Sequence, residues 1–180
     1  MRSEAFEKCV DILIEEFEGG YTHHQSDPGG ETKYGISKRR YPGVDIKSLT
    51  IGGAKRLYYT DYWLPLHLDN INSVAVAFEV FEFGVHAGIY TAACALQEAC
   101  NMLGAQPKLV VDGVIGSRTE CATNKLVKRY TKSLVMAINL IQGMHYAHLA
   151  DANPTKFTVF MKGWMRRLVP RLELDCVAWD

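Results

Sequence analysis

The sequence predicts a mainly α-helical protein with one small β-hairpin after its first helix. Most of the 180 residues fall in segments whose apolar side chains recur every three or four positions, which is typical of helices packed against a core. Residues 18–36 interrupt this periodicity with glycines, a proline and hydroxyl side chains. Such a composition cannot continue a helix and favours turns with short extended pieces, so the hairpin is expected there.

The first helix is expected over residues 3–17. Ser3 is a suitable N-cap because its hydroxyl can accept a hydrogen bond from a free amide of the first turn. Phe6, Val10, Leu13 and Phe17 recur on one face. That apolar face predicts burial in the core.

The later helices are bounded by capping residues, glycines and a proline. Thr50 precedes a helix to about Trp63, and Asn72 or Ser73 precedes an apolar helix from Val74 to about His86. Further helices are expected over 89–103, from the Ser117 cap to about 127, over 131–150, and from 154 to about 175 after Asn153. Gly88 and Gly104 act as breaks, and a loop is expected over 105–116. We expect two lobes, residues 1–90 and 91–180, packed together.

Composition bounds the class of protein. Apolar residues make up 48% and charged residues 22%, which suits one substantial core with a packed annex. The 20 basic and 20 acidic side chains cancel, so no global field favours nucleic acid or membrane as a partner. No apolar run approaches a membrane span, and residues 1–10 lack the apolar core of a signal peptide.

The five cysteines are odd in number and show no C-x-x-C spacing. They are Cys9, Cys94, Cys100, Cys121 and Cys176. Most of them lie in apolar helical segments, which favours reduced thiols in the core over disulfides or metal ligands. Reduced thiols are typical of synthesis in the cytoplasm. We therefore expect a monomer made in the cytoplasm of its host, without a membrane anchor.

Two carboxylic acids in residues 18–36 are expected to lie in unlike surroundings. Glu18 is at the end of the first helix, where the helix dipole and partial burial both favour its protonated form. Asp27 lies in the following loop, where solvent keeps a carboxylate ionised. Such a pair is typical of general acid and base work on a glycosidic bond. Each acid also has a simpler reading, as a surface acid for Glu18 and as a turn former for Asp27.

Several motifs resemble glycoside hydrolase family 108, the lysozyme-like N-acetylmuramidases found largely in phage endolysins. The signature residues are Glu18-Gly19-Gly20-Tyr21 and the run from Asp27 to Ile36. The order of Glu18, Asp27 and Thr32 is also similar to phage lysozyme of the T-even type. Further matches are Tyr62-Trp63, Leu96-Gln97, Asp112 to Thr119, and Phe160 to Arg167. Members usually carry Asp and Asn where this chain has Glu82 and His86.

The resemblance implies roles for particular residues. Glu18 would protonate the leaving oxygen, and Asp27 with Thr32 would position or activate water, while Glu31 competes for the role of second carboxylate. Tyr21, Tyr34, Tyr62 and Trp63 could line a sugar-binding cleft, because aromatic faces pack on pyranose rings, or they could be core anchors. The region after residue 91 resembles a peptidoglycan-binding domain.

No metal or other cofactor is expected. His23-His24 and the pair His145 and His148 have no third ligand at suitable spacing, and the Asp112-Gly113 turn supplies too few oxygens for calcium. Arg166-Arg167 is more typical of structural ion pairs than of a ligand clamp.

The predicted function is a peptidoglycan hydrolase, an endolysin that cuts the β-1,4 bond between N-acetylmuramic acid and N-acetylglucosamine. Its expected partners are bacterial peptidoglycan and a holin or other pore that gives access to the periplasm or cell wall for phage lysis. Two alternatives stay open: a lytic transglycosylase, and a non-catalytic wall-binding or secretion-accessory protein.

Overall fold

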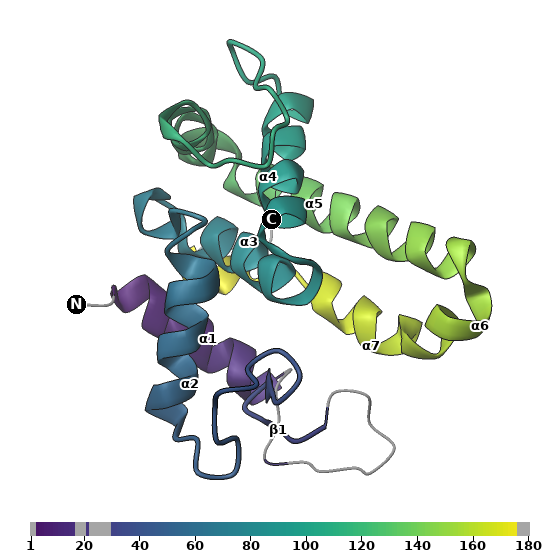
Figure 1. Ribbon diagram of the computed structural model, residues 1–180. Helices are drawn as coiled ribbons and strands as arrows, with labels where there is room; N and C mark the ends of the chain where they lie inside the picture. Colours follow the sequence, from purple (N-terminus) through teal and green to yellow (C-terminus); the bar gives the residue numbers. More distant parts are fainter. Residues whose placement is uncertain (1–2, 17–20, 22–29, 176–180) are drawn as a thin grey trace. The chain divides into compact units, whose positions relative to one another are not determined.

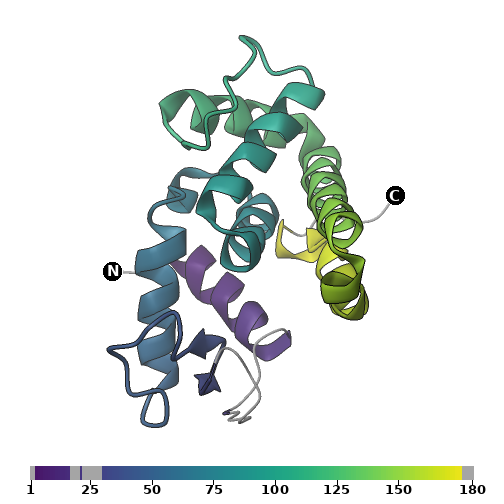
Figure 2. The ribbon, with the colours of Figure 1, turned by 45° about the vertical axis from the view of Figure 1, so that its right-hand side comes forward.

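The computed structural model describes residues 3–16, 21 and 30–175. The chain divides into two compact units, residues 1–64 and residues 65–180. Each unit is described by itself below. Figures 1 and 2 show both units from two directions.

Helix α1 (Glu4–Glu16) begins the first unit. Ser3 caps it as predicted, because its Oγ accepts a hydrogen bond of 3.2 Å from the amide of Phe6. The buried face comprises Phe6, Cys9, Val10, Leu13 and Ile14. The predicted apolar face is therefore confirmed for its described members, and Phe17 lies outside the described residues.

The predicted hairpin is formed by β1 (Thr32–Lys33) and β2 (Ile36–Ser37), which pair antiparallel. Its two-residue turn is Tyr34-Gly35, and both residues have positive φ, 51° and 74°. Two consecutive left-handed residues are the signature of a turn whose twist matches that of the flanking strands. The hairpin is therefore closed by local turn geometry.

The second helix of this unit changes character along its length. Helix α2 (Ile51–Tyr58) is capped by Thr50, whose Oγ1 accepts from the amide of Gly53 at 3.1 Å. It continues as the π-helical segment η1 (Tyr59–Trp63), where the amide of Leu64 donates to the carbonyl of Tyr59 at 2.9 Å. The rings of Tyr59 and Trp63 pack on Phe6 with centroids 5.0 and 5.4 Å away, which joins this helix to α1.

The second unit is built around helices α3 (Val74–Ala87), α4 (Ile89–Met102) and α5 (Ser117–Ala152), preceded by the short 3-10 segment η2 (Leu68–Asn70). Ser73 caps α3 by accepting from the amide of Val76 at 3.1 Å, and Gly88, with φ of 94°, separates α3 from α4 as predicted. Ten consecutive residues of α3, 75–84, are buried. Its near-continuous apolar sequence agrees with packing against both α4 and α5.

Helix α5 differs from the prediction in two ways. It joins the two helices predicted over 117–127 and 131–150 into one, with a kink at Tyr130 where φ is −136° and ψ is 32°. Gly116, not Ser117, is the N-cap residue, and no side chain caps the helix.

The final helical region is broken into short pieces rather than continuous. These are α6 (Pro154–Phe157), η3 (Thr158–Phe160), α7 (Met161–Met165), η4 (Arg166–Leu168) and η5 (Leu172–Asp175). In Figure 1 the segment from α6 to α7 turns back and runs along α5. Pro170 accounts for the break before η5, because proline has no amide to donate to a helix.

The predicted fold class, mainly α with one hairpin after the first helix, is confirmed. Within the described residues, no helix combines the length and the apolar character needed to cross a bilayer. No disulfide joins any two of the four described cysteines; Cys9 and Cys100 are buried, whereas Cys121 is exposed on α5 and is not the core thiol that was expected.

Candidate functional site

The hairpin holds the described part of the predicted active site. Thr32 is half-buried in β1, directly opposite Ser37 in the antiparallel register. Glu18 and Asp27 lie outside the described residues, so the catalytic roles of all three stay predictions. The antiparallel pairing with β2 sets the backbone position of Thr32.

Tyr21 and Glu31 are joined across the segment that precedes β1. The hydroxyl of Tyr21 donates to Oε1 of Glu31 at 3.1 Å, and the Tyr21 side chain is 42% exposed. Glu31, the competing second carboxylate, therefore already has a tyrosine as its hydrogen-bond donor. Tyr21 leaves part of its ring accessible to a sugar.

Two of the three other predicted sugar-binding aromatics, Tyr34 and Trp63, differ in exposure. Tyr34 is half-buried at the hairpin turn, its carbonyl accepts from the Tyr58 hydroxyl at 2.9 Å, and the Lys33 ammonium lies 5.4 Å from the centroid of its ring. Trp63 is fully buried and meets Phe6 edge to face. Trp63 therefore has the geometry of a core anchor in the first unit, which is the simpler of its two predicted roles. Sugar binding by Tyr34 and Trp63 stays a prediction.

The loop after the hairpin is fastened to the π-helical segment η1. The hydroxyl of Tyr41 donates to Oδ2 of Asp61 at 2.7 Å, and the guanidinium of Arg40 lies 5.2 Å from the ring centroid of Tyr62. Burial and the hydrogen bond to Asp61 raise the pKa of Tyr41, which keeps its hydroxyl protonated as a donor. These contacts link the loop after the hairpin to the π-helical segment η1.

A buried polar cluster in the second unit contains one residue where the chain departs from the family pattern. Glu82 on α3 is 0% exposed, forms an ion pair with Arg167 of η4, and accepts from Nε2 of Gln142 at 2.7 Å. Gln142 Nε2 also donates to the hydroxyl of Tyr146 at 2.7 Å. Burial raises the pKa of Glu82, and the charge of Arg167 opposes that rise. Arg167 is thus a structural ion-pair partner, as predicted for Arg166-Arg167.

His86, the second departure, lies among aromatic rings. Its ring centroid is 5.2 Å from that of Tyr146 and 5.7 Å from that of Trp164, both edge to face. Burial and the nearby Arg167 charge lower its pKa to about 4, so it is neutral at physiological pH. His86 therefore serves packing between α3 and the C-terminal segment.

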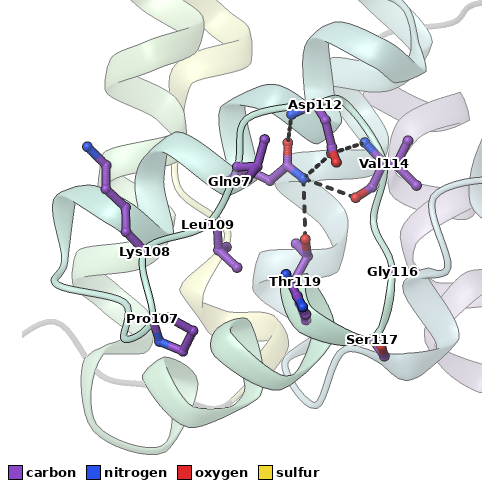
Figure 3. A pocket seen from close by; sticks show the side chains of 11 residues that line it. Gln97, Pro107, Lys108, Leu109, Asp112, Val114, Gly116, Ser117 and Thr119 are labelled. Atoms are coloured by element: carbon purple, nitrogen blue, oxygen red, sulfur yellow. Dashed lines mark hydrogen bonds between the residues drawn. The ribbon is translucent and has the colours of Figure 1, made fainter.

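The Gln97 side chain forms a network of hydrogen bonds with the loop between α4 and α5 and with the start of α5 (Figure 3). We call this network the Gln97 clasp. Gln97 is 1% exposed, and its Nε2 donates to Oδ1 of Asp112 at 2.8 Å, to the carbonyl of Val114 at 3.0 Å and to the hydroxyl of Thr119 at 3.3 Å. Its Oε1 accepts from the amides of Asp112 and Gly113, each at 3.0 Å. One buried amide therefore satisfies both sides of the Asp112-Gly113 turn.

The clasp explains two motifs that the sequence indicated only as separate stretches, Leu96-Gln97 and Asp112 to Thr119. A buried glutamine in an apolar helix was the available signal, because such an amide needs partners. The cationic side chains beside this turn, Lys108, Arg118 and Lys125, were not predicted as functional, since nothing in their spacing distinguishes them from solvated surface charges. No group of three or more metal-ligating side chains occurs in the described parts of the chain.

Comparison with known proteins assigns the two halves of the sequence. Residues 12–88 match the family described as glycosyl hydrolase 108, and residues 91–169 match the family described as predicted peptidoglycan domain. The two matches meet beside Gly88, whereas the compact units divide at residues 64 and 65, because α3 packs on α4 and α5. The predicted lobe boundary near residue 90 stays a prediction.

One solved structure is similar to this chain over most of the length of both proteins. The structure of Brucella abortus SagA has 26% sequence identity and a TM-score of 0.69, with 91% of this chain and 88% of that chain covered. No curated protein has a sequence that matches this chain significantly. The resemblance found in the motifs is confirmed: residues 12–88 form a glycosyl hydrolase 108 domain and residues 91–169 form a predicted peptidoglycan domain, and the two together support a peptidoglycan hydrolase.

Proposed function

We propose that this peptidoglycan hydrolase is an N-acetylmuramidase that cleaves the β-1,4 bond between N-acetylmuramic acid and N-acetylglucosamine. The observation that carries the proposal is the family 108 match over residues 12–88, which includes the two acids Glu18 and Asp27 and the hairpin with Thr32. A glycoside bond needs a proton donor for the leaving oxygen and activation of the attacking group. In this proposal Glu18 is the proton donor, and Asp27 with Thr32 prepares the water.

The decisive experiment compares the products of wild type and Glu18→Gln on purified murein. We expect wild type to release fragments with reducing N-acetylmuramic acid ends, detected by mass spectrometry. Glutamine has the shape of glutamate but cannot donate the proton, so the rate should fall at least about 100-fold. Full clearance of murein by the variant would refute the role of Glu18. Products ending in 1,6-anhydromuramic acid would show transglycosylation instead.

Aromatic residues near the hairpin supply a second test of the same proposal. Tyr21 has an exposed ring and a hydroxyl bonded to Glu31. Tyr21→Phe removes that hydrogen bond and keeps the ring, whereas Tyr21→Ala removes both. If the ring stacks on a sugar, Tyr21→Ala should raise KM for murein more than Tyr21→Phe does. Equal KM values for the two variants would exclude stacking at this position.

For the cellular role we propose an endolysin that is made in the cytoplasm and reaches the wall through a holin or similar pore. The support is chemical: no disulfide joins any two of the four described cysteines, as in proteins that fold under reducing conditions. Expressed without a pore in a Gram-negative host, the protein should be tolerated, and co-expression of a holin should trigger lysis. Lysis without any pore would contradict this route.

A further inference from the structure

Two adjoining pockets lie where the loop between α4 and α5 meets the start of α5. One has a volume of about 360 Å³ and includes Gln97, Lys108 and Asp112 in its lining. The other has a volume of about 350 Å³ and includes Cys121, Ala122 and Lys125. The pockets have four lining residues in common: Pro107, Leu109, Ser117 and Arg118. We call the two together the α5 groove.

The walls of the α5 groove are held in place by internal hydrogen bonds. The Gln97 clasp fixes the Asp112-Gly113 turn on one side (Figure 3). Asn101 fixes the other side, because its Nδ2 donates to the carbonyl of Leu109 at 2.9 Å and its Oδ1 accepts from the Leu109 amide at 2.7 Å. A groove that is already ordered loses little conformational entropy when a ligand binds.

The charge of the α5 groove is positive although the whole chain is neutral. Lys108, Arg118 and Lys125 are exposed, and none of them forms an ion pair with an acidic side chain in the described part of the protein. Asp112 is the carboxylate among the lining residues, and its Oδ1 already accepts from Gln97 and from the amide of Val114. Three cations are therefore available to a ligand against one carboxylate that is engaged internally.

The remaining lining mixes aliphatic with uncharged polar side chains, and it contains no aromatic ring among the described residues. Pro107, Leu109, Val114 and Ala122 contribute aliphatic surface between the cations. Sugar rings are usually bound by stacking on aromatic faces, which this groove lacks, whereas carboxylates are bound by lysine and arginine. The lining therefore suits a short peptide that alternates carboxylates with small alkyl side chains better than it suits a glycan.

We propose that the α5 groove binds the peptide stem of peptidoglycan through its carboxylates. The proposal rests on the function proposed above, because it takes peptidoglycan as the ligand, and it adds that the peptide, rather than the glycan, is recognised at this place. Arg118 is central because it lines both pockets. Its planar guanidinium can hold one carboxylate with two hydrogen bonds, while Lys108 and Lys125 act on neighbouring charges.

The test measures binding of a synthetic stem tetrapeptide, L-Ala-γ-D-Glu-diaminopimelate-D-Ala, to the full-length protein by isothermal titration calorimetry. The variant Lys108→Gln/Arg118→Gln/Lys125→Gln removes the three cations. The matched control is Lys128→Gln/Arg129→Gln/Lys162→Gln, which removes three exposed cations that do not line the groove. Circular dichroism and thermal melting confirm that both variants are folded. A second ligand, the same peptide with amidated carboxyl groups, reports on charge directly.

We expect the Kd of the tetrapeptide to rise at least about tenfold in the groove variant, because at least one charge-assisted hydrogen bond is lost. In the control variant the Kd should rise less than about twofold. Amidation of the peptide should weaken binding to wild type by a similar factor. Equal losses in the two variants, undiminished binding of the amidated peptide, or no binding of the tetrapeptide at millimolar concentration would overturn the proposal. Tighter binding of a glycerol phosphate polymer would also overturn it.

Reducing ends released from murein are measured on the same protein preparations. Release of reducing ends without peptide binding would refute the groove proposal and leave the muramidase proposal intact. Peptide binding without reducing ends would refute the muramidase proposal and leave the groove as a peptide site. The two proposals are therefore separable in a single set of samples.

Discussion

Replacement of Glu79 by Gln is expected to stabilise the protein at alkaline pH and to remove part of its sensitivity to pH. Glu79 lies on α3 with 1% exposure, and its Oε1 accepts from the backbone amide of Arg171 at 3.1 Å. Burial, with the nearby Glu82 carboxyl as a smaller cause, raises its pKa from 4.5 to about 8. Glutamine keeps the acceptor oxygen for Arg171 and carries no charge at any pH.

The sign and size of the effect follow from proton linkage. Between pH 4.5 and 8 the folded protein keeps the Glu79 proton, which the unfolded chain releases, so the free energy of unfolding falls as the pH rises. The difference between the two pKa values corresponds to about 5 kcal/mol over the whole interval. Between pH 6.5 and 8 alone the loss is about 1.5 kcal/mol. His86, with its lowered pKa, changes stability in the opposite direction, and does so equally in wild type and variant.

The assay is urea unfolding at pH 5, 6.5 and 8, followed by circular dichroism. Wild type and Glu79→Gln should agree within about 1 kcal/mol at pH 5, and the variant should be more stable by several kcal/mol at pH 8. Glu173→Gln is the matched control, because the Glu173 side chain is 60% exposed and near the same segment. Parallel pH dependences for wild type and Glu79→Gln would refute the reasoning that burial keeps Glu79 protonated.

Three further predictions test other parts of the molecule. Arg167→Met leaves the buried Glu82 carboxylate without its cation, so the free energy of unfolding measured in urea should fall by about 3–5 kcal/mol. Adding Glu82→Gln to the same chain should restore most of this loss of stability. Gly113→Ala should cost about 1–3 kcal/mol in thermal unfolding, because φ is +74° there and a Cβ would lie 2.3 Å from the Tyr90 ring; unchanged stability would contradict this geometry. Asp27→Asn should lower kcat on murein by about 100- to 10,000-fold with KM nearly unchanged, and a wild-type kcat would move attention to Glu31.

The sequence was sufficient for features that depend on neighbouring residues. The caps of α1, α2 and α3 at Ser3, Thr50 and Ser73 are confirmed, because a cap needs only a hydroxyl next to free amides of its own first turn. The hairpin was predicted from residues 18–36 for a similar reason, since Tyr34 and Gly35 form its turn locally. The resemblance to the family was also found from local motifs, because the residues around Glu18 and Asp27 and the Asp112-Gly113 turn are read directly from the sequence, and they lie inside the two matched regions.

Contacts between distant residues were decided only by the tertiary structure. Glu82 and Arg167 are 85 positions apart, and no periodicity of either segment indicates that α3 and η4 meet. The structure also joins two predicted helices into α5, which has a kink at Tyr130 and packs against α3 and α4. The α5 groove exists because Gln97 and Asn101 on α4 hold a loop that follows them, so that Lys108 and Arg118 face one space. The sequence determines which groups can form hydrogen bonds. The tertiary structure decides which of these groups are buried and therefore need a partner, because an unpaired polar group in the core lowers the free energy of unfolding.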